Sequence, residues 1–226
     1  MDKERLLKSV RHNLLYLAAG KKEKENLEHI IEAIRAVDRF FFVRDREDAY
    51  FDTALSIGYN QTISQPSTVA RMLMLAELGS GKNLLELGAG SGWNASLAGF
   101  LIYPGKVLSL DIVPQLIEKA RENLNSLKDS MGYEERKKLD NIEFRVLNIF
   151  KQLDTWQERY DRIIITAGIN QTQEGLILQL AEELLLDKGI LVCPYTYGPL
   201  IILKKDDGSI KKNTTREEYV FVPLLD

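Results

Sequence analysis

Hydrophobic and polar residues follow a helical rhythm at the start of the chain. In residues 1–19, and again in 27–37, apolar side chains recur every three or four positions among charged ones. This spacing predicts two amphipathic helices, separated by Gly20 and the charged run 21–25. Because we find no strand pattern there, we expect residues 1–60 to form a helical cap on the main domain rather than a domain of their own.

From residue 83 onward, short apolar runs alternate with amphipathic helical segments. The runs predict strands at 83–87, 106–111, 142–147, 160–168 and 189–194, and the polar stretch 128–140 predicts a loop. The end of the chain is typical of antiparallel strands, near 200–204 and 219–222, with a turn at 206–209. This alternation indicates a doubly wound α/β domain over residues 61–226, with a mostly parallel sheet and an antiparallel C-terminal edge.

Composition excludes several kinds of chemistry. The 226 residues carry a net charge of -3 without a sustained basic block, which argues against a dedicated nucleic-acid binder. His12 and His29 are the only histidines and Cys193 is the only cysteine, so we expect no metal site and no histidine triad. With no possible intrachain disulfide and no apolar run of membrane-spanning length, we predict a cytoplasmic protein without a membrane partner.

The most informative stretch lies between residues 83 and 93. An apolar strand there breaks into Gly88, Gly90 and Gly92, and a helical pattern follows at once. Glycine permits positive φ and lacks Cβ, so a ligand can lie against bare backbone. Asp111 ends the next strand, where a carboxylate can accept both hydroxyls of a ribose. We therefore predict a pocket for a nucleoside cofactor.

Two further residues bear on which cofactor binds. A dinucleotide fingerprint requires a glycine where this chain has Trp93, and Glu86 would be a poor neighbour for pyrophosphate but could pair with a cation. The loop resembles that of the seven-stranded S-adenosylmethionine (SAM) methyltransferases, which implies SAM and a seven-stranded sheet. Asn148 ends the following strand and could contact adenine, or could simply be a turn residue. A glycine turn in another doubly wound fold, such as a dehydrogenase, remains the alternative.

Over about residues 30–223 the sequence resembles the protein-L-isoaspartate O-methyltransferases. The segments that carry the resemblance are Ala49–Gly58, Gln61–Pro66, Leu85–Trp93, Tyr160–Ala167 and Phe221–Leu224. The glycine loop is shared by many methyltransferases, whereas the segment from Gly58 to Pro66 is much more particular to this family. Three regions depart from the family pattern: Ser56 replaces a proline, Asn148–Phe150 replaces Gly-Asp-Gly, and the loop 195–199 differs.

The resemblance implies an enzyme that transfers a methyl group from SAM to the α-carboxylate of L-isoaspartyl residues in aged proteins and peptides. The resulting ester collapses to a succinimide that can reopen to normal aspartate. By the same resemblance Ser64 is the active-site serine, although spacing alone would make Thr62 and Ser64 caps of the helix beginning at Pro66. The implied cofactor-binding residues are Thr62, Ile63, Ser64, Glu86, Gly88, Gly90, Ser91, Gly92, Asp111, Ile112, Asn148 and Ile149.

The expected chemistry suits a chain so poor in histidine. A carboxylate with a pKa near 4 is already ionised at neutral pH and needs no general base, so the site has only to position it against the methyl carbon. Two alternatives stay open. One is a methyltransferase of the same fold that acts on a different carboxylate or peptide, and the other is a SAM-binding protein without activity.

Overall fold

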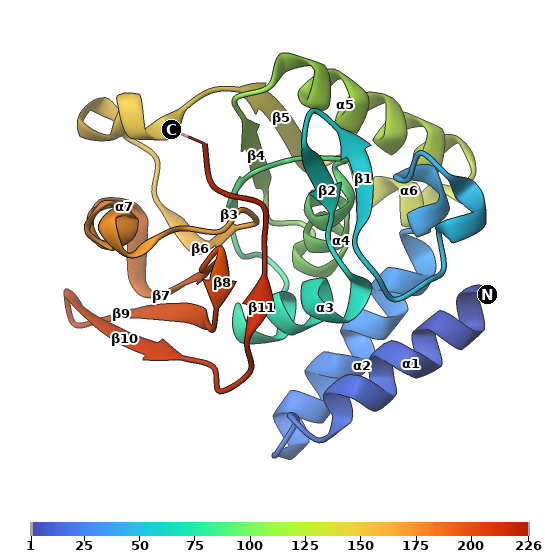
Figure 1. Cartoon of the computed structure of the whole chain (residues 1–226), viewed down its shortest axis with the longest axis horizontal. Helices are drawn as coiled ribbons and strands as arrows, with labels where there is room; N and C mark the ends of the chain where they lie inside the picture. The colour runs from blue at the N-terminus through green and yellow to red at the C-terminus, as the bar shows by residue number, and fades with distance from the viewer. Residues whose placement is uncertain (1, 226) are drawn as a thin grey trace.

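A seven-stranded sheet runs through the middle of the molecule, in the order β10-β9-β7-β6-β3-β4-β5 (Figure 1). The structure is a computed structural model that describes residues 2–225. The strands are β3 (Leu84–Leu87), β4 (Val107–Asp111), β5 (Ile142–Val146), β6 (Tyr160–Ile165), β7 (Leu185–Pro194), β9 (Leu200–Asp206) and β10 (Ser209–Thr214). Strands β3 to β7 pair in parallel, and β9 and β10 add an antiparallel edge. The predicted fold class is confirmed.

Helices cover both faces of this sheet, because successive strand residues point to opposite sides. On one face, Leu84 and Ile164 belong to a core shared with α1 to α5; on the other, Leu85 and Ile163 pack with α7 and the segment after β5. The helices are α1 (Lys3–Leu15), α2 (Lys21–Ala36), α3 (Pro66–Leu75), α4 (Trp93–Ile102), α5 (Pro114–Asp129) and α7 (Glu174–Leu184). None of the helices within residues 2–225 is both long and apolar enough to cross a membrane.

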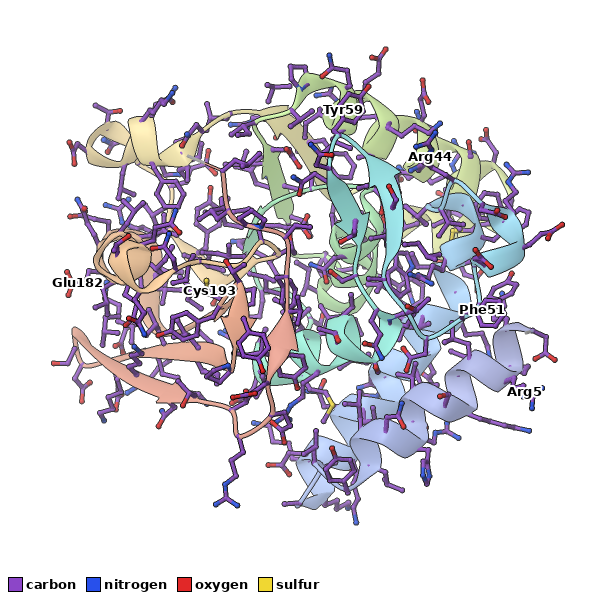
Figure 2. The ribbon with its side chains drawn as sticks, in the orientation of Figure 1. Arg5, Arg44, Phe51, Tyr59, Glu182 and Cys193 are labelled. Atoms are coloured by element: carbon purple, nitrogen blue, oxygen red, sulfur yellow. The ribbon has the colours of Figure 1, made fainter. Side chains whose placement is uncertain are left out.

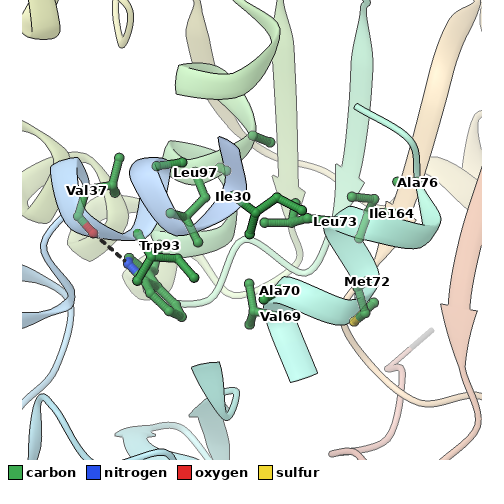
Figure 3. Close-up of a cluster of buried hydrophobic side chains, with 14 of the residues drawn as sticks. Ile30, Val37, Val69, Ala70, Met72, Leu73, Ala76, Trp93, Leu97 and Ile164 are labelled. Atoms are coloured by element: carbon green, nitrogen blue, oxygen red, sulfur yellow. Dashed lines mark hydrogen bonds between the residues drawn. The ribbon is translucent and has the colours of Figure 1, made fainter. Parts of the chain in front are cut away.

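The N-terminal helices are joined to the main domain by a continuous core. Ile30 of α2 and Leu73 of α3 are fully buried in it, and Figure 3 shows them beside Leu97 and Trp93 of α4. Contrary to the expectation that residues 1–60 hold no strand, β1 (Leu55–Gly58) pairs with β2 (Gln61–Ile63). The predicted boundary after residue 60 therefore falls inside this hairpin, and the division into cap and catalytic domain remains a proposal.

Backbone conformation explains the hairpin. Tyr59 and Asn60 have φ of 54° and 57°, and positive φ at both central residues is the mark of a type I′ turn, which matches the twist of paired strands. Four residues with mixed burial are too few to show a period of two, so the strand was missed. Figure 2 places Tyr59 at the tip of this hairpin.

Two other segments differ from expectation. The polar stretch 128–140 holds the short helix α6 (Tyr133–Lys137), which has no buried residue and so gave no apolar period. The predicted last strand, β11 (Tyr219–Val220), does not join the main sheet but pairs with β8 (Tyr197–Gly198). The segment after β11 then crosses the end of β6, where the Gly168 N–H donates to the Val222 carbonyl at 2.7 Å.

The strand order reverses at β3, because β4 lies on one side of it and β6, later in the chain, on the other. In parallel sheets such a reversal leaves a crevice at the carboxyl ends of the strands. The glycine loop follows β3, Asp111 ends β4, and Thr166 follows β6. The fold thus brings all three to one place.

Candidate active site

The glycine loop after β3 adopts a conformation that depends on its glycines. Gly88 and Gly92 have φ of 98° and 85°, a region that other residues rarely occupy. A Cβ on Gly88 would lie 2.4 Å from Thr166 Oγ1, and one on Gly92 would lie 3.0 Å from Ala120 Cβ. The first glycine therefore allows the loop to approach β6, and the last allows α4 to start against α5.

Asp111 and Thr166 hold this loop from its two sides. The Gly90 N–H donates to Asp111 Oδ2 at 3.0 Å, and the Val113 N–H donates to Asp111 Oδ1 at 3.0 Å. Thr166 Oγ1 donates to the Gly88 carbonyl at 2.6 Å. Each carboxylate oxygen has two lone pairs, so Asp111 keeps acceptor capacity for a ligand while it fixes the main chain around it.

Two adjoining pockets form one cleft over the loop and share Gln61, Gly88, Asp111 and Ala167. One pocket is mostly apolar and is lined at its far end by Ile112, Asn148, Ile149, Phe150 and Leu224. The other is more polar and includes Thr62, Ile63, Ser64, Gly90, Ser91, Asn94 and Thr166. Asp111 is the one charged side chain among the residues that line either pocket within the described chain.

The structure therefore brings together every predicted site residue except Glu86 and Gly92. Gly92 lies at the start of α4, where its carbonyl accepts the Ser96 hydroxyl at 2.7 Å. Ser91 lines the polar pocket but is only 5% exposed. Asn148 uses its amide oxygen to accept the Phe150 N–H at 3.1 Å. The amide nitrogen of Asn148 makes no hydrogen bond within the described residues, and its oxygen keeps one lone pair, so both groups can still meet adenine.

Ser64 lies on the wall of the polar pocket, between β2 and α3. Its hydroxyl has no hydrogen-bond partner among residues 2–225, and its carbonyl accepts from Arg39 Nη2 at 3.3 Å. Spacing alone suggests that Thr62 and Ser64 cap α3, but neither side chain does so. Instead, Asp52 Oδ1 accepts the Ser67 N–H at 2.9 Å. The Ser64 hydroxyl is thus free to meet a ligand.

Glu86 occupies a different position from the one predicted. It is fully buried beneath the loop, where one carboxylate oxygen accepts from Asn94 Nδ2 at 2.7 Å and the other accepts from the Ser109 hydroxyl. Burial raises the pKa of Glu86 to about 7, against the lowering effect of these two hydrogen bonds. Glu86 lines neither pocket, whereas Asn94, which donates to it, lines the polar one. The expected direct pairing of the Glu86 carboxylate with a cationic ligand group therefore has no support in this geometry.

The raised pKa of Glu86 predicts a specific pH dependence of stability. In the window from the ordinary value of 4.5 to about 7, the folded protein holds a proton that the unfolded chain releases, so wild-type stability falls as pH rises through it. Glu86→Gln removes this titration. The Tm of the variant should therefore rise relative to wild type as pH increases from 4.5 to about 7. Thermal denaturation of both ligand-free proteins tests this, and a constant difference in Tm would contradict it.

Sequence reasoning missed several residues that line the cleft. Thr166 and Ala167 follow β6 beside the strand reversal, a position that could have been recognised from the strand order alone. Asn94 gave no signal, because its contact with Glu86 depends on how α4 is placed over β3. Leu224 reaches the apolar pocket because its N–H donates to the Gly168 carbonyl at 2.8 Å.

Comparisons with known proteins give a consistent result. The family model described as "Protein-L-isoaspartate(D-aspartate) O-methyltransferase (PCMT)" matches residues 11–226. The chain is 36% identical over 214 residues to protein-L-isoaspartate O-methyltransferase 2 of Archaeoglobus fulgidus, covering 92% of this chain and 90% of the relative. It is 35% identical over 206 residues to the protein-L-isoaspartate O-methyltransferase of Pyrococcus horikoshii, covering 88% and 85%.

Solved structures show the same fold. A protein-L-isoaspartate O-methyltransferase from Plasmodium falciparum, crystallised in complex with S-adenosyl-L-homocysteine, superposes with a TM-score of 0.77 at 22% identity. The superposition covers 100% of this chain and 99% of that one. Another protein-L-isoaspartate O-methyltransferase superposes with a TM-score of 0.74 at 21% identity, covering 100% and 66%.

Proposed function

The chain belongs to the protein-L-isoaspartate(D-aspartate) O-methyltransferase family and is a SAM-dependent methyltransferase, and we propose that its cleft joins SAM to the free α-carboxylate of an L-isoaspartyl residue. The observation that carries this proposal is the charge of the cleft. Asp111 is the one charged side chain that lines the cleft within residues 2–225. A single negative charge suits SAM, whose sulfonium ion gives it a net positive charge. The glycine spacing disfavours a dinucleotide, because Trp93 stands where the dinucleotide fingerprint requires a glycine.

The residues of the cleft fit the parts of SAM in order. Asp111 would accept the ribose hydroxyls, and Ile112 and Ile149 would enclose the adenine ring, with the Asn148 amide nitrogen as a donor. The bare main chain at Gly88 and Gly90 would lie along the methionine part. The Asn94 amide nitrogen donates to Glu86, and its amide oxygen, which accepts no hydrogen bond within the described residues, would accept from the ammonium group. Bound there, SAM supplies an electrophilic methyl group on a sulfonium ion.

The chain has little to do in the transfer beyond positioning. The acceptor carboxylate is ionised at neutral pH, so no base is required. We assign to the Ser64 hydroxyl the task of holding that carboxylate by a hydrogen bond, because it is a partnerless donor on the wall of the polar pocket. Thr62 and Ile63 would enclose the same end of the cofactor. Because opposite charges disappear as the methyl group moves, exclusion of water from this pocket favours the reaction.

We propose isoaspartyl-containing proteins and peptides as the physiological substrates, and the cytoplasm as the location. Support for the location is the one cysteine, Cys193, which is buried with a strongly raised pKa and is therefore an inert thiol rather than a disulfide partner. Figure 2 places it in the sheet, away from the β1–β2 hairpin. The absence of nucleic-acid and membrane partners remains a prediction.

Methyl transfer to a matched pair of peptides tests the proposed substrate. The peptides share one sequence and differ only in whether a single residue is L-isoaspartyl or L-aspartyl. The isoaspartyl peptide should accept methyl from SAM, and its aspartyl twin should not, because only the former presents a main-chain α-carboxylate. Equal transfer to both would indicate a different carboxylate substrate. Cofactor binding without transfer to either would indicate a binding protein.

A further inference from the structure

Arg39 is a buried cation whose charge is favoured by Asp52 through space but not by a direct ion pair within residues 2–225. It lies in the short helix η1 (Arg39–Phe41) after α2, is 1% exposed, and makes no salt bridge to a described carboxylate. Its guanidinium instead donates to four backbone carbonyls: Ala49 at 3.1 Å, Phe51 at 3.0 Å, Thr53 at 2.8 Å and Ser64 at 3.3 Å. The first three carbonyls belong to one loop and the fourth to the proposed catalytic serine.

The same guanidinium contacts the other half of the site. It lies over the ring of Trp93, 5.4 Å from the ring centroid, within reach of a cation–π interaction. Trp93 is the first residue of α4, directly after the glycine loop, and its Nε1 donates to the Val37 carbonyl at 3.0 Å (Figure 3). Arg39 therefore lies between the loop that would hold the cofactor and the segment that would hold the acceptor.

The loop that Arg39 binds also supports the start of α3. Asp52 lies between two of the carbonyl acceptors, and its carboxylate receives the Ser67 N–H at 2.9 Å. The segment from Ser64 to Ser67 is thus tied to the loop 49–53 at both of its ends, once through the guanidinium and once through Asp52. Ser64 has no other described support for its carbonyl.

The choice of arginine is significant in physical terms. A charge is expensive to bury, and well-packed apolar residues often stabilise a fold as well as buried ions do. A planar guanidinium can direct its donors at several carbonyls at once, whereas lysine offers three donors from a single point. Burial lowers the pKa of Arg39 to about 10, so the side chain stays charged at neutral pH.

We infer that Arg39 is a positioning residue for methyl transfer, which fixes the main chain at Ser64 relative to the glycine loop. This inference rests on the proposed function of Ser64. A displacement of about 1 Å at a reacting group can cost about 100-fold in rate, so loosening one of four anchoring bonds should be visible in turnover. Cofactor affinity should change little, because Asp111 and Thr166 hold the glycine loop independently.

Arg162 provides a matched control. It is 7% exposed and also donates to backbone carbonyls, those of Glu77, Asp161 and Lys188, but it lies at the opposite end of the sheet, near the start of β6. Arg39→Lys and Arg162→Lys both weaken a buried guanidinium network and should both lower the Tm. We expect only Arg39→Lys to reduce kcat on the isoaspartyl peptide, by about tenfold or more, with the Kd for S-adenosylhomocysteine (SAH) within about threefold of wild type.

Hydrogen exchange provides a readout that does not depend on activity. Backbone amides in residues 49–53 and 61–65 should exchange faster in Arg39→Lys than in wild type, and at the wild-type rate in Arg162→Lys. If the wild-type protein does not methylate the isoaspartyl peptide, the proposed function is wrong. Hydrogen exchange still tests whether Arg39 anchors residues 49–53 and 61–65. Unchanged exchange and kcat in Arg39→Lys, or an equal loss of kcat in Arg162→Lys, would overturn the inference. If Arg39→Lys does not fold, Arg39→Gln is tested in its place. If neither Arg39 variant folds while Arg162→Lys does, Arg39 is needed for folding only and the inference is overturned.

Discussion

Replacing Asp111 by alanine should weaken SAH binding by about 100-fold or more. Hydrogen bonds to a charged group contribute about 1.5–3 kcal/mol each, and two ribose hydroxyls would lose theirs, at about 1.4 kcal/mol for each factor of ten. The variant also leaves the Gly90 and Val113 N–H groups without their acceptor, which disorders the main chain on which the cofactor would lie. Titration calorimetry with SAH measures the loss directly.

Asp161→Ala controls for the general cost of removing a partly buried carboxylate. Asp161 accepts the Asn83 N–H at 2.9 Å and pairs with Lys82 at 2.9 Å, at the end of the sheet away from the cleft. It should lose stability but bind SAH as wild type does. Equal losses of affinity in the two variants would mean that Asp111 acts through folding rather than through the ribose.

Ser64→Ala should lower methyl transfer to an isoaspartyl peptide by about 10- to 100-fold, while the Kd for SAH stays within about threefold. The lost bond joins a hydroxyl to a carboxylate, a contact of about 1.5–3 kcal/mol, and it is made only once the acceptor is in place. Because the Ser64 hydroxyl has no partner among residues 2–225 and its carbonyl bond to Arg39 is retained, the fold should be undisturbed. Steady-state kinetics with saturating SAM measures the effect.

Ser56→Ala is the appropriate comparison for this variant. Ser56 lies on the opposite strand of the same hairpin, paired with Thr62, and is exposed. Its removal should leave kcat near the wild-type value. A Ser64→Ala enzyme as active as Ser56→Ala would contradict the role given to the serine.

The parts of this site that were predicted from sequence are those that the local backbone determines. Gly88 and Gly92 require positive φ, and Asp111 ends an apolar strand. A few residues of sequence around each position are enough to recognise these features. The fold class followed from the alternation of strands and helices in the same way. The mostly parallel sheet needed no knowledge of distant contacts, whereas the antiparallel edge is formed by β9 with β10 and not by the strand predicted near 219–222.

The parts that were not predicted depend on contacts between distant segments. Glu86 lies on β3, which is buried on both faces, so its sequence could not show that the side chain points at Ser109 and Asn94 rather than at the ligand. Arg39 directly precedes three phenylalanines, and the carbonyls that accept its hydrogen bonds lie up to 25 residues further along the chain. The hairpin β1–β2 was missed because its strands are too short to show a period.

Titration of SAH into the wild-type protein, with NAD as the comparison ligand, tests the central claim most directly. The claim is that the cleft beside Asp111 is built for a nucleoside that ends in an amino acid rather than for a dinucleotide with a pyrophosphate. We expect saturable binding of SAH at one site per chain and no heat from NAD. A folded wild-type protein that binds NAD, or that binds neither ligand, would contradict it.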